Sequence, residues 1–125
     1  MIVDDDVGMA ETCAMLLEAY GFEVRTASSG AEALTKLDGK SPELLIADAE
    51  VPGMSGSELC AKINRQVIAA PVPMLMISAS ARSAIPSMQN YDAFLRKPFL
   101  AESFLGAIDG LLPGVCTRSN NLVRQ

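Results

Sequence analysis

Short apolar runs alternate along this chain with segments of helical period. Residues 1–3, 44–47, 74–77 and 93–95 are continuous apolar runs, which predict strands buried on both faces of a sheet. Residues 22–26 alternate apolar and polar positions, as expected for a half-exposed edge strand. This alternation of strands and helices predicts an α/β fold with a doubly wound, five-stranded parallel sheet and helices on both faces.

Four segments have helical spacing and recognisable ends. The first follows Asp6, a predicted N-cap, and stops at Gly21. Ser29 to Glu32 and Ser55 to Glu58 form two capping boxes. The apolar positions that define the four helical faces are Met9, Cys13, Leu16, Leu17 and Tyr20; Ala33, Leu34 and Leu37, before Gly39; Leu59, Ile63 and Val67; and Phe104, Leu105, Ile108, Leu111 and Leu112, before Pro113-Gly114.

Composition narrows the classes of function. With 125 residues, of which 50% are hydrophobic, the chain is long enough for one domain with a real core. The net charge of −5 argues against a nucleic-acid surface, which needs clustered Lys and Arg. The sequence contains no histidine, so no His-dependent catalytic triad is possible within it. Three widely spaced cysteines, no long apolar span and no secretory leader together predict a protein of the cytoplasm.

Charged and hydroxyl side chains stand where the predicted strands end. Asp4 and Asp5 follow the first strand, Asp48 follows the third, and Ser78 and Lys97 follow the fourth and fifth. Ligands of open parallel sheets bind beyond the carboxyl ends of the strands, so we expect these side chains to converge. Clustered carboxylates repel one another and select a hard cation, Mg²⁺ or Mn²⁺. Asp48 could then act as a nucleophile toward a phosphoryl group, with Lys97 and Ser78 contacting its oxygens.

Four short stretches carry a resemblance to a known family. They are VDDD at 3–6, DAEVPGMSG at 48–56, MISAS at 76–80 and FLRKPF at 94–99, each at a predicted strand end. Together they resemble the receiver domain of two-component response regulators, over Ile2 to about Leu112. The resemblance implies the flavodoxin-like strand order 2-1-3-4-5, a receiver domain over residues 1–113, and a polar tail or the start of a linker at 114–125.

The resemblance also implies roles and partners. The phosphoryl donor would be a sensor histidine kinase or a histidine phosphotransfer protein. The protein would be a phosphorylated signalling switch, with its own phosphorylation and dephosphorylation chemistry, rather than a metabolic enzyme. A homodimer could form through the face made by the segment after Ser78, the strand at 93–95 and the last helix, with no direct contact to nucleic acid or membrane. The implied site is Asp48 as phosphoacceptor; Asp4, Asp5, Asp48 and the Glu50 backbone carbonyl as Mg²⁺ ligands; Ser78 as switch hydroxyl; Phe94 as switch aromatic; and Lys97, joined to Pro98 by a cis bond.

Three features depart from the family pattern. Only three residues of the first strand precede Asp4, whereas strands usually have five or six, so we expect a truncated strand, for instance from a late start codon. Pro86 lies between Ser78 and Lys97 and predicts a short or irregular helix there. Glu50 adds a carboxylate two residues after Asp48 and could affect the lifetime of a phosphorylated form.

Two other functions remain open from the residues alone. A haloacid-dehalogenase-like Mg²⁺ phosphatase also uses an Asp nucleophile, a Ser or Thr and a Lys on an α/β sheet, and Asp4-x-Asp6 could supply its first motif. Such enzymes need a later acidic metal motif, for which this sequence offers only Asp109. An inactive pseudo-receiver that only binds a partner is the third possibility, and the presence of Asp48, Ser78 and Lys97 argues against it.

Overall fold

A computed structural model of the chain describes residues 1–37, 40, 42–49, 53–54, 56–66, 72–79 and 91–112. Its centre is a five-stranded, fully parallel sheet in the order β2-β1-β3-β4-β5. The predicted fold class and strand order are therefore confirmed. The strands are β1 (Ile2–Val3), β2 (Thr26–Ala27), β3 (Leu45–Asp48), β4 (Met74–Ser78) and β5 (Ala93–Arg96).

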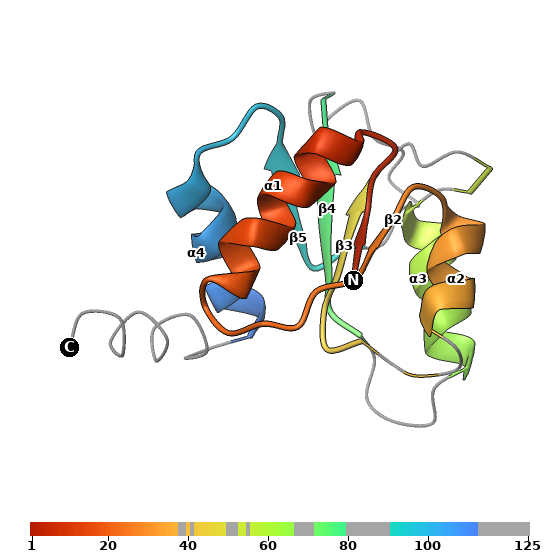
Figure 1. The fold of residues 1–125 in the computed structure, drawn as a ribbon. Coiled ribbons are helices and arrows are strands. Elements are labelled where there is room, and N and C mark those ends of the chain that lie inside the picture. The colour runs from red at the N-terminus through yellow and green to blue at the C-terminus, as the bar shows by residue number, and fades with distance from the viewer. Residues whose placement is uncertain are drawn as a thin grey trace.

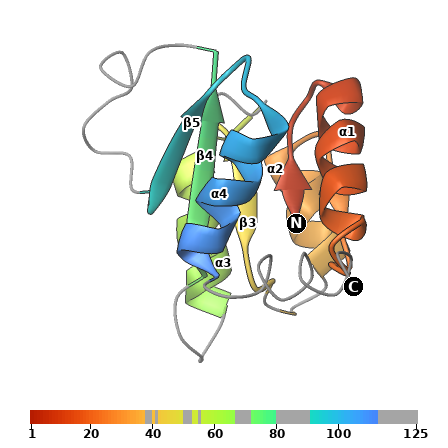
Figure 2. The same ribbon diagram turned by 90° about the vertical axis from the view of Figure 1, so that its left-hand side faces the viewer.

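Helices cover both faces of the sheet. The described helices are α1 (Val7–Glu18), α2 (Gly30–Leu37), α3 (Gly56–Gln66) and α4 (Ala101–Leu111). In Figure 1, α1 and α4 lie on one side of the strands and α2 and α3 on the other, and the view turned by 90° in Figure 2 agrees. Within the described residues, no helix is both long enough and apolar enough to span a bilayer.

The core is divided by the sheet into two apolar layers. Along β4, Met74 and Met76 belong to the layer under α2 and α3, whereas Leu75 and Ile77 belong to the layer under α1 and α4. Successive side chains of a strand point to opposite faces, so a strand covered on both sides must be apolar at every position. This requirement explains the unbroken apolar runs in the sequence.

The predicted ends of the first helix are confirmed. The Asp6 carboxylate accepts a hydrogen bond of 3.1 Å from the Met9 N–H, which caps α1 at its start. Gly21 follows the last turn of α1 with φ of 88°, a conformation in which a side chain is unfavourable.

The first capping box is confirmed in one half only. The Glu32 N–H donates to Ser29 Oγ at 3.1 Å, as predicted. The Glu32 carboxylate, however, accepts from the hydroxyl of Ser28 at 2.8 Å and, at 3.4 Å, from its N–H, rather than from Ser29. The Ser28 hydroxyl makes the shorter of these two contacts. The second capping box cannot be described, because its cap residue, Ser55, lies outside the described residues. The same holds for Gly39, Val67, Pro86 and the tail from residue 113.

The second strand is shorter than predicted. Residues 22–25 keep the expected alternation, with Phe22 and Val24 packed against the core and Glu23 and Arg25 exposed, but only Thr26 and Ala27 form a ladder. The physical reason is that β2 pairs with β1, whose two residues, Ile2 and Val3, lie opposite Thr26 and Ala27.

Candidate functional site at the carboxyl ends of the strands

The acidic residues at the start of the chain are fixed by the sheet. Asp4 follows β1, and its N–H donates to the Ala27 carbonyl at 3.0 Å. Its side chain is buried, and Oδ1 accepts the N–H of Asp6 at 2.9 Å, which closes a tight turn into α1. Asp5 lies in that turn and is exposed. One carboxylate of the pair is therefore held inside the molecule while the other faces solvent.

Asp48 meets these residues from the neighbouring strand. It is the last residue of β3, opposite Ile77 of β4, and the next N–H, that of Ala49, donates to the Ile77 carbonyl at 2.8 Å. Because β1 and β3 are adjacent and parallel, their carboxyl ends lie side by side. Asp4, Asp5 and Asp48 each offer a carboxylate oxygen within 4.8 Å of the others.

Lys97 brings a positive charge into the acidic group. Its Nζ donates to Asp4 Oδ2 and to Asp48 Oδ2, each at 2.7 Å, and its side chain is only 15% exposed. Burial works to lower the pKa of Lys97, but the hydrogen bonds and charges of Asp4 and Asp48 outweigh it and raise this pKa above its ordinary value. The ammonium is thus charged at any physiological pH. The bond from Lys97 to Pro98 is cis, as predicted.

Ser78 lies at the end of β4, and Phe94 lies on β5, the strand that Lys97 follows. Ser78 ends β4, is 3% exposed, and its carbonyl accepts the Lys97 N–H at 2.8 Å. Phe94 of β5 pairs with Met76, is half-buried, and lies 5.9 Å from the Tyr91 ring, centroid to centroid. The structure therefore brings carboxylate oxygens of Asp4, Asp5 and Asp48 within 4.8 Å of one another, joins Asp4 and Asp48 through Lys97, and places Ser78 at the same sheet edge. Glu50 lies outside the described residues.

One neighbour of the site was not predicted from the sequence. Cys13 of α1 is buried, and burial, with a further contribution from the negative charge of Asp4, raises the pKa of its thiol to about 11. The sequence pattern indicated only that Cys13 belongs to the apolar face of its helix. The high pKa makes this thiol unreactive at neutral pH.

The donor set fits a hard divalent cation. Its three carboxylates repel one another by about 3 to 4 kcal/mol per pair at an effective dielectric near 20, and one lysine offsets only part of that repulsion. Carboxylate oxygens are the ligands that Mg²⁺ and Mn²⁺ prefer, and the exposed Asp5 leaves the group open to solvent on one side.

The same contacts disfavour a phosphatase that uses Asp4-x-Asp6. Both oxygens of Asp4 accept hydrogen bonds, one from the Asp6 N–H and one from Lys97. The Asp6 carboxylate caps α1 and is exposed, so it is not directed at a substrate position beside Asp4. Asp48, the last residue of β3, contributes a carboxylate to the same group and contacts Lys97 at 2.7 Å.

Known proteins with similar sequences and folds are response regulators. A sequence model described as the response regulator receiver domain matches residues 1–109. The chain is 34% identical to the transcriptional regulatory protein CpxR homolog of Haemophilus influenzae, over 98% of this chain and 53% of that protein. It is 31% identical to protein PilG of Pseudomonas aeruginosa, over 90% of this chain and 86% of PilG.

A solved structure shows the same fold. The crystal structure of a putative response regulator from Chloroflexus aurantiacus superposes with a TM-score of 0.77 at 32% identity, covering 89% of this chain and 93% of that one. The share of each relative that the chain spans varies, from about half of the CpxR homolog to most of PilG. On the family match, the strand order and these relatives, the chain belongs to the response regulator receiver domain family.

Proposed function

We propose that the chain is a phosphorylatable switch whose Asp48 accepts a phosphoryl group from a histidine kinase or a histidine phosphotransfer protein. The observation that carries the proposal is the acidic group itself: Asp4, Asp5 and Asp48 converge within 4.8 Å, and Lys97 bridges the two more buried members. The sequence contains no histidine, so a phosphohistidine donor would have to be supplied from outside it.

Each residue of the site has a defined part in this reaction. An oxygen of the Asp48 carboxylate forms the new bond to phosphorus, while the bond from phosphorus to the donor atom breaks and its electron pair leaves with the donor. Lys97 lies beside Asp48 Oδ2 and can hold a phosphoryl oxygen in place of it. Mg²⁺, held by Asp4, Asp5, Asp48 and the Glu50 carbonyl, would neutralise charge on the transferring oxygens.

Ser78 and Phe94 would report the reaction to the surface. Ser78 is buried at the end of β4, the strand next to that of Asp48, and its hydroxyl can donate to a phosphoryl oxygen. Phe94 is half-buried on β5, beside Met76, and can move toward the space that Ser78 leaves. The face that changes would be the one formed by the segment after Ser78, β5 and α4, which could also support a homodimer. Phosphorylation would add negative charge at Asp48 and would thereby shift the equilibrium between two conformations of this face.

The proposal is tested by intact mass after incubation with acetyl phosphate and Mg²⁺. We expect one added phosphoryl group, with acetate as the leaving group, and no addition when EDTA removes the cation. Asp48→Asn should abolish the addition. Asp6→Asn is the matched control, because asparagine caps a helix as well as aspartate does and Asp6 has no part in the proposed transfer.

The same experiment separates the two other functions. Turnover of a phosphomonoester that Asp6→Asn abolishes and Asp48→Asn leaves intact would identify the phosphatase instead. An unchanged mass with acetyl phosphate, and also with a phosphorylated histidine donor, would identify an inactive binding module. Either result contradicts the proposed switch.

A further inference from the structure

Two residues far apart in the sequence meet at the start of α2. Gly30 is the first residue of α2 and is buried, and Met54 lies between β3 and α3. Met54 is half-buried and packs against the core layer under α2 and α3, which lie side by side on this face of the sheet (Figure 1). Their contact therefore joins the part of the chain that follows Asp48 to a helix from an earlier part of the sequence.

This contact depends on the absence of a side chain at residue 30. A β-carbon added at Gly30 would lie 2.9 Å from Met54 Sδ, 3.1 Å from its Cβ and 3.3 Å from its Cε. The Met54 side chain thus lies lengthwise against Gly30. Rotation about the side-chain bonds could move Sδ and Cε away, but Cβ moves only with the backbone. An alanine at residue 30 would consequently push the backbones of α2 and of Met54 apart by a few tenths of an ångström.

Backbone conformation does not account for the glycine at residue 30. In the described part of the chain, the glycines with positive φ are Gly21 and Gly53, whereas Gly30 is helical, and alanine is ordinarily preferred to glycine in a helix. Gly53 has φ of 76°, and a β-carbon there would meet nothing within 4 Å. The two glycines beside Met54 therefore differ in their parts. Gly53 permits the turn before Met54, and Gly30 makes room for its side chain.

The segment between Ala49 and Met54 is anchored at both ends. Ala49 is 5% exposed, and its N–H donates to the Ile77 carbonyl at 2.8 Å. Met54 is held at the other end by its contact with Gly30. Only four residues, 50–53, connect the two anchors, and a short segment with both ends fixed has fewer conformations than one with a free end. The carbonyl of Glu50, a metal ligand in the proposed function, belongs to this segment.

We propose that Gly30 and Met54 are positioning residues for the metal site. Their contact restrains residues 50–53, so that the Glu50 carbonyl and the Asp48 carboxylate are held together for Mg²⁺. The inference rests on the proposed function, because it concerns the same site. Mg²⁺ demands near-ideal octahedral placement of its ligands, so a shift of a few tenths of an ångström weakens its binding. Residues that orient metal ligands without touching the metal typically change its affinity by about 10- to 100-fold.

The first test measures Mg²⁺ affinity by titration calorimetry, on the whole chain and at a temperature at which every variant is folded. Gly30→Ala should raise the Kd about tenfold, because it displaces Met54. Met54→Ala should raise the Kd by a similar factor, because it removes the thioether that lies on Gly30. The double variant should also bind about tenfold more weakly, rather than about a hundredfold, because both substitutions act through one contact.

Two further substitutions of glycine by alanine separate positioning from stability. Gly106→Ala adds the same methyl group to α4 at a position where it would meet nothing within 4 Å. Gly21→Ala adds it where φ is 88°, so backbone strain should lower the melting temperature by several degrees. Both variants should keep the Mg²⁺ Kd within about twofold of the unsubstituted chain. A tenfold loss of affinity in Gly21→Ala would overturn the inference, since any loss of stability would then have the same effect.

Amide hydrogen exchange tests the restraint without a metal. In EDTA, Gly30→Ala should speed exchange at the Ala49 amide by at least about fivefold, and should leave unchanged the Leu45 amide, which donates to the Pro73 carbonyl at the other end of β3.

The inference is overturned if exchange at Ala49 does not change, if Gly30→Ala binds Mg²⁺ as tightly as the unsubstituted chain, or if the two substitutions at the contact add to about a hundredfold. Failure of the unsubstituted chain itself to bind Mg²⁺ would overturn the proposed function, and this inference with it.

Discussion

At the scale of single residues, the site depends on one cation among three anions. Lys97 contacts two carboxylates that differ in exposure, 4% for the side chain of Asp4 and 13% for that of Asp48. An ion pair this well buried contributes little net stability when complete, yet removing one partner leaves the other charge uncompensated. The arrangement therefore makes the fold sensitive to the lysine in the absence of a bound cation.

Lys97→Met should lower the free energy of unfolding by about 3 kcal/mol at neutral pH, because Asp4 and Asp48 would face each other and Asp5 without a positive charge between them. Methionine keeps an unbranched stem of similar length, which isolates the loss of charge. The measurement is urea unfolding in EDTA. Arg96→Met is the control. The Arg96 side chain, next to Lys97 in the sequence, is exposed, so we expect this substitution to change the free energy of unfolding by no more than about 0.5 kcal/mol. If the two variants were equally stable, the proposed energetic role of the buried ion pairs of Lys97 with Asp4 and Asp48 would be wrong.

At the scale of elements, local signals set the helix starts and tertiary pairing sets the strand lengths. The N–H of Glu32 donates to Ser29 Oγ, and an i,i+4 ion pair of 3.0 Å joins Glu32 to Lys36, so the first turn of α2 is stabilised by its own sequence. β2, by contrast, has only the two residues for which β1 provides a partner. Phe22 to Arg25 have strand-like alternation without a ladder for that reason.

Ser29→Ala should cost about 1 kcal/mol of stability, because it leaves an N–H of the first turn of α2 without its cap. Ser28→Ala is the matched control. It removes a hydroxyl that donates to the Glu32 carboxylate, whose side chain is 39% exposed, so its cost should stay below about 0.5 kcal/mol. Thermal unfolding of both variants measures the difference. A larger loss for Ser28→Ala would mean that the Glu32 contact, rather than the Ser29 cap, holds the start of α2.

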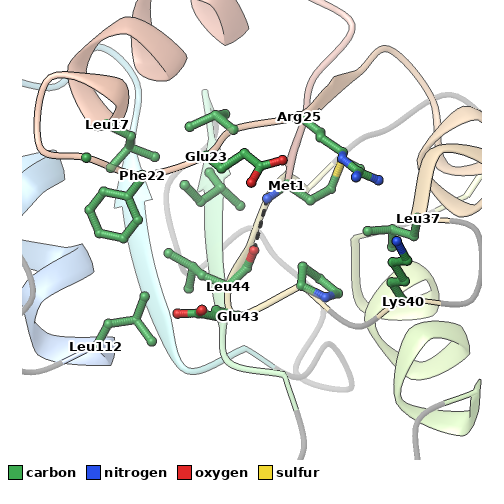
Figure 3. Close-up of a pocket in the computed structure, with 14 residues that line it drawn as sticks. Met1, Leu17, Phe22, Glu23, Arg25, Leu37, Lys40, Glu43, Leu44 and Leu112 are labelled. Carbon is green, nitrogen blue, oxygen red and sulfur yellow. Dashed lines mark hydrogen bonds between the residues drawn. The ribbon is translucent and has the colours of Figure 1, made fainter.

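At the scale of the whole molecule, the two edges of the sheet have opposite character. At the carboxyl edge, Asp4, Asp5, Asp48 and Lys97 form a charged group that several strands hold in place. At the amino edge, the Met1 amine lies in a pocket lined by residues 22–25, which lead into β2, and residues 42–44, which lead into β3 (Figure 3). Because the sheet separates the two edges, phosphorylation at the carboxyl edge and the effect of the Met1 amine on the free energy of unfolding can be measured independently.

The stability of the chain should rise between pH 6 and pH 8. The pKa of the Met1 amine is about 6 in the folded state and 8.0 as the reference value, so the unfolded chain binds more protons within this window and protonation favours unfolding. The gain across the window should be about 2 kcal/mol, measured by chemical denaturation at each pH. The window contains no histidine titration, since the sequence has none.

Acetylation of the Met1 amine is the control for this effect, because it removes the titrating group and should flatten the profile. A slope that survives acetylation would assign the pH dependence to another group. A flat profile in the untreated chain would contradict the burial of the amine.

Much of the fold and of the candidate site followed from the sequence. Short unbroken apolar runs are typical of strands covered on both faces, and Asp6, Gly21 and Ser29 act through contacts a few residues away, so local rules were sufficient for them. Parallel topology then brought Asp4, Asp5, Asp48 and Lys97 to one edge, because the carboxyl ends of parallel strands share it. The predicted hydrogen bond from the Ser29 N–H to the Glu32 carboxylate was wrong. The carboxylate accepts from Ser28 instead, and the sequence alone could not show which serine would be its donor.

The sequence by itself determined the α/β class, the strand positions and the residue types at the strand ends, because these depend on periodicity and on the chemistry of each side chain. Only the tertiary structure decided that Lys97 bridges Asp4 and Asp48, that β2 has two paired residues, and that the Met1 amine lies in a pocket between the leads into β2 and β3. These features depend on distances between segments far apart in the chain, and such distances are set by packing rather than by local pattern.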